Sequence, residues 1–161
     1  MLLFPLIMVL AAARDVMTRR IPNRLVILSV VAFFPLALIA GMPWWLVLVH
    51  GATAASLFVA GLVLFALGIL GAGDGKLMAA AGLWLGFPAS ILFIGLTAIS
   101  GALLAAAMAL FVLLELEVSA RSSAAGDAFR QLSPKVPYGF ALAAGAILAT
   151  PFSWMMRAAG G

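Results

Sequence analysis

Cysteine is absent from this 161-residue chain, and its absence excludes three kinds of chemistry. The chain can form no disulfide framework, it offers no thiol nucleophile, and it has no cysteine ligands for zinc. Charge is also scarce, since only 9% of the residues are charged, whereas a soluble domain carries roughly 25%. Apolar residues make up 66% of the chain. We therefore predict an integral membrane protein, with a single membrane-embedded domain over residues 1–161.

Apolar runs separated by glycine, proline or charged residues predict an all-α fold with six transmembrane helices. A bilayer core of about 30 Å needs about 20 helical residues. Charge arrives only at Arg14, after the first apolar run, which is the reverse of a secretory signal. We therefore expect a retained first helix. The expected helices cover residues 1–17, 25–40, 44–70, 77–86, 89–114 and 137–156, with a polar loop over 115–135.

The basic residues predict the orientation of these helices. Eight of the nine fall on one side of the predicted arrangement, and only Arg157 falls on the other. The positive-inside rule assigns the first side to the cytoplasm, so both termini are expected on the non-cytoplasmic side. Because the positive charge is explained as a topology signal, we expect no nucleic-acid partner. The eight are Arg14, Arg19, Arg20, Arg24, Lys76, Arg121, Arg130 and Lys135, and the tryptophans expected near the outer membrane surface are Trp44, Trp45, Trp84 and Trp154.

Two aspartates are expected at the inner ends of short helices, on the same side. Asp15 ends the first helix, and Asp74 lies in the motif GAGDGK at residues 71–76. An ionisable side chain near a helix centre costs about 2.5–3.5 kcal/mol to insert, which favours a functional role. Two carboxylates that share a site do not readily carry two charges together, so one can take a proton from water while the other donates one to a scissile amide. They titrate as a unit, and we assign neither role to one residue.

The residues around Asp74 are expected to support this chemistry. Gly71, Gly73 and Gly75 permit positive φ and close backbone approach, which would let Asp74 swing toward Asp15 or let an extended substrate lie beside the motif. Lys76 is expected to pair with Asp74 or with carbonyl groups of the substrate.

Simpler explanations exist for each of these residues. Asp74 can be the N-cap of the helix expected at 77–86, Asp15 can pair with Arg14 or Arg19, and the glycines can form a flexible reversal. Their combination favours chemistry, because the same-side placement rests on charge counts and not on the motif. His50 is expected to lie at the membrane interface or to pack between helices, with a proton-relay role as its alternative. Glu115, Glu117 and Asp127 are expected to face solvent, and Tyr138-Gly139 is expected to pack, with the active cleft as its alternative.

Three sequence blocks resemble the type IV prepilin peptidases, which are GxGD aspartic proteases. The blocks are Asp15 with RRIPN at 19–23, GAGD with Lys76-Leu77, and Val136-Pro137-Tyr138-Gly139. The chain looks most like the short, peptidase-only members that serve Tad/Flp pilus systems. The resemblance implies six transmembrane helices in the bacterial inner membrane, with catalytic Asp15 and Asp74 toward the cytoplasm. It implies no metal and no cofactor.

The reaction that the resemblance implies is removal of the short leader of type IV or Flp prepilins, or of pseudopilins, just before their hydrophobic helix. The lipid bilayer and the pilus assembly machinery are then the expected partners. Bifunctional relatives carry an added methyltransferase portion with paired cysteines, which this chain lacks, so N-methylation is not expected. Two other hypotheses remain open: a small proton- or ion-coupled transporter using the same carboxylates, and a non-catalytic membrane subunit of a secretion machine.

Overall fold

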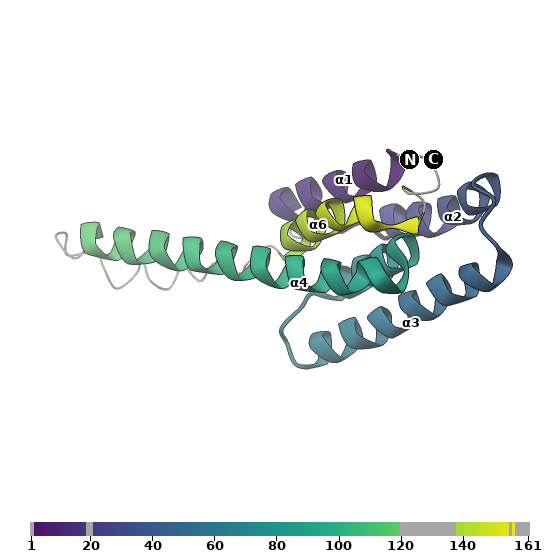
Figure 1. The fold of residues 1–161 in the computed structure, drawn as a ribbon. Coiled ribbons are helices and arrows are strands. Elements are labelled where there is room, and N and C mark those ends of the chain that lie inside the picture. The colour runs from purple at the N-terminus through teal and green to yellow at the C-terminus, as the bar shows by residue number, and fades with distance from the viewer. Residues whose placement is uncertain (1, 19–20, 120–137, 155, 157–161) are drawn as a thin grey trace.

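A computed structural model of the protein describes residues 2–18, 21–119, 138–154 and 156 (Figure 1). This part of the chain is helical and contains no strand, so the predicted all-α fold is confirmed there. The elements are α1 (Leu3–Thr18), α2 (Asn23–Ile39), α3 (Trp44–Ala66), α4 (Ala72–Ser119), α6 (Tyr138–Ala149) and the 3-10 helix η1 (Thr150–Phe152).

Gly86 divides α4 into two arms, which we call the first arm (72–85) and the second arm (87–119). Its φ of 70° and ψ of 176° lie outside the helical region, in backbone space that favours glycine. The turn predicted at 86–88 is therefore present, but it is confined to one residue. The predicted start of the first of these helices and the predicted end of the second were wrong. The first arm begins at Ala72 and not at residue 77, and the second arm continues to Ser119 and not to residue 114.

The third predicted helix ends earlier than expected, at Ala66. Gly68 adopts a φ of 73°, and its N–H donates to the Phe65 carbonyl at 2.9 Å. The N–H of Ile69 reaches back to the carbonyl of Leu64, also at 2.9 Å. This pair of bonds is the Schellman arrangement, in which a left-handed glycine closes a helix. The apolar run through Leu70 hid this end, because hydropathy alone does not distinguish helix from turn.

The helices pack in two antiparallel contacts around α4. The first arm packs along α3, where Gly75 meets Gly61 and Gly82 meets Leu57. The second arm packs on α6, which also contacts α1 (Figure 1). The far end of the second arm projects beyond the other helices, while a Cβ on Gly101 would lie 3.7 Å from the Cβ of Ala141 in α6.

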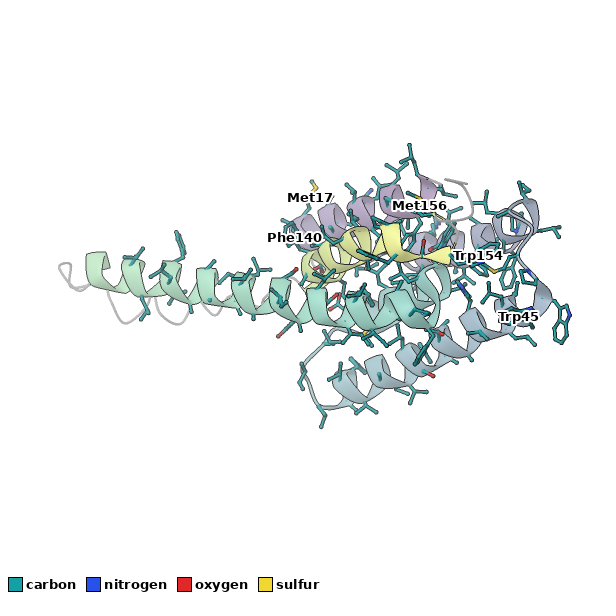
Figure 2. The ribbon with its side chains drawn as sticks, in the orientation of Figure 1. Met17, Trp45, Phe140, Trp154 and Met156 are labelled. Atoms are coloured by element: carbon teal, nitrogen blue, oxygen red, sulfur yellow. The ribbon has the colours of Figure 1, made fainter. Side chains whose placement is uncertain are left out.

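The buried core corrects one prediction about tryptophan. Trp84 is not an interfacial residue: only 4% of it is exposed, its ring stacks on Phe4 at 5.3 Å, and its Nε1 donates to the Ser29 carbonyl. Trp45 is exposed, and Trp154 lies at the same end of the molecule, opposite the end of Met17 and Phe140 (Figure 2).

His50 packs inside the helix bundle, which is one of the two positions expected for it. It is buried, and its Nδ1 lies 2.7 Å from the carbonyl oxygen of Leu83, one turn before the break in α4. The imidazole lies against Gly86, where a Cβ would come within 2.5 Å of Nε2. The histidine therefore satisfies a carbonyl next to the break and fills the space that glycine leaves.

The surface is that of a membrane protein. Large apolar side chains are exposed on every one of the long helices, beyond what a soluble monomer presents. Trp44–Ala66 and Ala72–Leu114 are long and apolar enough to cross a membrane, and Asn23–Ile39 and Tyr138–Phe152 are apolar but shorter. Six spans and the sides of the termini remain predictions.

Candidate functional site

A cavity of about 310 Å³ opens where the end of α1, the start of α2 and the start of α4 meet. Asp15 and Asp74 both line it, although they are distant in the sequence and belong to different helices. The other lining residues are Ile21, Asn23, Gly71, Ala72, Gly73 and Lys76. The structure thus brings together all five residues that the sequence nominated: the two aspartates, Gly71, Gly73 and Lys76.

Asp15 is held by the start of α6. It is only 7% exposed, and its Oδ2 accepts a hydrogen bond of 2.8 Å from the N–H of Gly139. The first N–H groups of a helix have no partner within the helix, so they are free to bind an acceptor such as this carboxylate. A Cβ on Gly139 would lie 2.7 Å from Oδ2 and 2.8 Å from Cγ of Asp15. Only glycine allows α6 to approach so closely.

Gly139 is therefore a site residue, a role that the sequence analysis gave only as the alternative to packing. Tyr138-Gly139 was assigned mainly to packing, with the active cleft as the alternative. The structure favours that alternative for Gly139, because its N–H binds Asp15 directly. The sequence does contain a signal for this role of Gly139. The glycine lies at the start of the helix expected at 137–156, and the predicted topology places that start on the same side as the inner end of the first helix.

Asp74 closes the start of its own helix. It is buried, and its Oδ2 accepts a hydrogen bond of 3.1 Å from the N–H of Gly71, the residue immediately before α4. An acidic side chain in the first turn that reaches back to the residue before the helix is half of a capping box. Asp74 is thus not the N-cap, and the N-cap interpretation was wrong about its position, because the helix begins at Ala72.

The glycines of the motif act by close packing and not by positive φ. Among the described glycines, positive φ occurs at Gly41, Gly68 and Gly86. A Cβ on Gly73 would meet the Cβ of Ile21 at 3.2 Å, and one on Gly61 would lie 2.7 Å from the Cα of Gly75. The sequence therefore predicted the close approach correctly and the backbone conformation wrongly. These contacts fix the first turn of α4 against α3 and against the segment before α2.

Lys76 does not pair with Asp74 in this structure. Its Nζ donates to Oδ1 of Asn23 at 3.1 Å. Within the described ranges, neither Asp15 nor Asp74 forms an ion pair, and both side chains line one cavity. Arg19, one expected partner of Asp15, lies outside the described residues. The described part also contains no group of three or more histidine or acidic side chains arranged to hold a metal ion.

A larger apolar groove of about 470 Å³ lies beside this cavity, between α3, the second arm of α4 and α6. Leu70 and Tyr138 line it, and each directly precedes a glycine whose N–H binds one of the two carboxylates. Gly101, Ala102 and Ala105 form part of its wall. The geometry therefore combines an acidic cavity with an adjoining apolar surface.

Comparison with known proteins gives one match. A family model described as the type IV leader peptidase family matches residues 2–118, which include both carboxylates and the whole GAGDGK motif. Neither the curated proteins nor the solved structures contain a match to the chain.

Proposed function

Since this chain belongs to the type IV leader peptidase family, we propose that it is an intramembrane aspartic endopeptidase that cleaves the leader from prepilins. The single observation that carries the proposal is that Asp15 and Asp74 line one cavity. Family membership implies a peptidase acting on prepilins. Membership does not favour the transporter hypothesis. A transporter would instead show solute flux in the absence of any peptide substrate.

The proposed reaction is amide hydrolysis by one water molecule. The ionised carboxylate of the pair takes a proton from water as the water oxygen bonds to the scissile carbonyl carbon. The protonated carboxyl then gives its proton to the leaving nitrogen as the C–N bond breaks. The products are a carboxylic acid and an amine, and the pair ends with one proton, as it began.

The hydrogen bonds to the backbone support this role. Each aspartate directs Oδ2 to a backbone N–H, that of Gly139 for Asp15 and that of Gly71 for Asp74. We propose that the other oxygen of each carboxylate meets the water or the substrate. A general acid or base acts efficiently only when its position is held, and helix starts at both carboxylates provide that restraint.

The apolar groove supports a substrate with a hydrophobic helix. A prepilin carries its cleavage site directly before such a helix, so a groove that adjoins the carboxylates would hold the helix while the leader junction enters the cavity. We further propose that the protein is a multi-pass protein of the bacterial inner membrane, that its site faces the cytoplasm and that it serves a Tad/Flp-type pilus. The distribution of basic residues in the sequence and the three sequence blocks support these assignments.

The test is co-expression with a candidate Flp-type prepilin, followed by mass measurement of the product. Asp15→Asn and Asp74→Asn should each abolish leader removal while the protein still inserts in the membrane. Ser100→Ala is the control, because the Ser100 hydroxyl bonds only a carbonyl of its own helix. Processing at the normal rate by either Asn variant would refute the two-carboxylate mechanism.

A further inference from the structure

Asn23 and Lys76 form a hydrogen-bonded bridge between two residues that line the candidate site. The Lys76 Nζ donates to Oδ1 of Asn23 at 3.1 Å, and both side chains line the cavity that holds Asp15 and Asp74. Asn23 is the first residue of α2, and Lys76 lies in the second turn of α4. The bridge therefore joins two elements that are far apart in the chain, at the cavity itself.

A second contact fixes the same segment. Ile21 packs on Gly73 so tightly that a Cβ on the glycine would lie 3.2 Å from the Ile21 Cβ. The chain before α2 is thus held against the start of α4 at two points, one apolar and one polar.

The chemistry of the bridge suggests what it does. An ammonium group has three N–H donors, and the amide oxygen of Asn23 occupies one of them. The amide is neutral, so it orients the positive charge without cancelling it, as a carboxylate partner would. A free lysine side chain samples many rotamers, and this hydrogen bond restricts that freedom before the substrate arrives.

We propose that Lys76 is a further catalytic residue of the peptidase and that Asn23 is the residue that positions it. Lys76 donates an N–H to the carbonyl oxygen of the scissile amide. As the water oxygen bonds to the carbonyl carbon and its proton passes to the ionised carboxylate, the electron pair of the C=O bond moves to an oxygen that faces this ammonium. The protonated carboxyl is then free to protonate the leaving nitrogen. The inference rests on the proposed peptidase function.

The experiment is a double-mutant cycle on the full-length protein in detergent, with a synthetic prepilin peptide as the substrate. Lys76→Met should lower kcat about 10²-fold, the usual effect of losing one donor to a developing oxyanion. Asn23→Ala should lower kcat about 10-fold, with KM little changed. The double variant should match Lys76→Met alone, because Asn23 acts only through Lys76. Lys76→Arg should recover part of the lost kcat by restoring the charge.

Arg24→Met is the matched control, since Arg24 is an exposed cation next to Asn23 that does not line the cavity, and its kcat should be unchanged. A kcat within twofold of the unsubstituted protein for Lys76→Met overturns the catalytic role. Multiplying losses in the double variant overturn the positioning role. A purely structural bridge would lower the unfolding temperature and leave kcat per folded molecule intact, which would also overturn the proposal. If Asp15→Asn remains active, the peptidase mechanism itself fails, and this outcome is distinct from the others.

Discussion

Gly139→Ala tests how closely the position of Asp15 depends on α6. The added Cβ would lie 2.7 Å from Oδ2 and 2.8 Å from both Cβ and Cγ of Asp15. Such contacts are closer than packed atoms tolerate, so either the carboxylate rotates away or α6 moves. Both movements break the 2.8 Å hydrogen bond between the Gly139 N–H and Oδ2.

The expected loss is large because the displaced group is proposed to be catalytic. A hydrogen bond to a charged group contributes about 1.5–3 kcal/mol, and a misplacement of about 1 Å in a catalytic group can cost about 10²-fold in rate. We therefore expect kcat/KM for prepilin peptide cleavage to fall about 10²-fold. Stability should change less, since alanine is a better helix former than glycine by about 1 kcal/mol and offsets part of the strain.

The assay compares kcat/KM and unfolding temperature for Gly139→Ala and two control variants. Gly145→Ala creates a closer clash on the same helix, because the Cβ would meet Thr97 Oγ1 and would lie 2.8 Å from the Thr97 nitrogen and 3.0 Å from the Phe93 carbonyl oxygen, away from the carboxylates. It should destabilise the protein without a comparable loss of activity per folded molecule. Gly95→Ala adds a Cβ that meets open space in the described part of the chain and should leave kcat/KM unchanged. Equal activity losses for Gly139→Ala and Gly145→Ala would refute the reasoning.

Two further predictions concern the framework that positions the motif. Gly61→Ala would place a Cβ 2.7 Å from the Cα of Gly75 and would force α3 away from the first arm of α4. The free energy of unfolding, measured by heat or denaturant, should fall by about 1–3 kcal/mol. Unchanged stability would contradict that contact. His50→Ala leaves the Leu83 carbonyl without its side-chain partner and opens a cavity beside Gly86. The free energy of unfolding should fall by about 2–4 kcal/mol in the same measurement. A neutral result would contradict the packing role of His50.

Much of the fold could be predicted from the sequence because membrane helices leave strong signals. The apolar runs located the helices, and the Gly-Phe-Pro at 86–88 located the break in α4. The helix ends were less predictable. The left-handed Gly68 ends α3 inside an apolar run, and the second arm continues to Ser119 although the composition turns polar after Leu114.

The charge counts predicted that Asp15 and Asp74 lie on one side of the bundle, and the structure adds that both line one cavity. Details that depend on three-dimensional contact did not follow. Trp84 was assigned to an interface because tryptophan often lies there, yet its ring and N–H both find partners in the core. The partners of the site residues, Gly139 for Asp15 and Asn23 for Lys76, depend on how helices far apart in the sequence meet.

The proposed catalytic roles of Asp15 and Asp74 are tested most directly by whether the two residues act as one unit. Single-turnover cleavage of a prepilin peptide should be measured for Asp15→Asn, Asp74→Asn and the double variant, with folding confirmed for each. Residues that act together show strongly non-additive losses. We predict that all three variants have the same residual rate. A double variant much slower than either single variant, or a single variant with nearly full activity, would contradict the two-carboxylate mechanism.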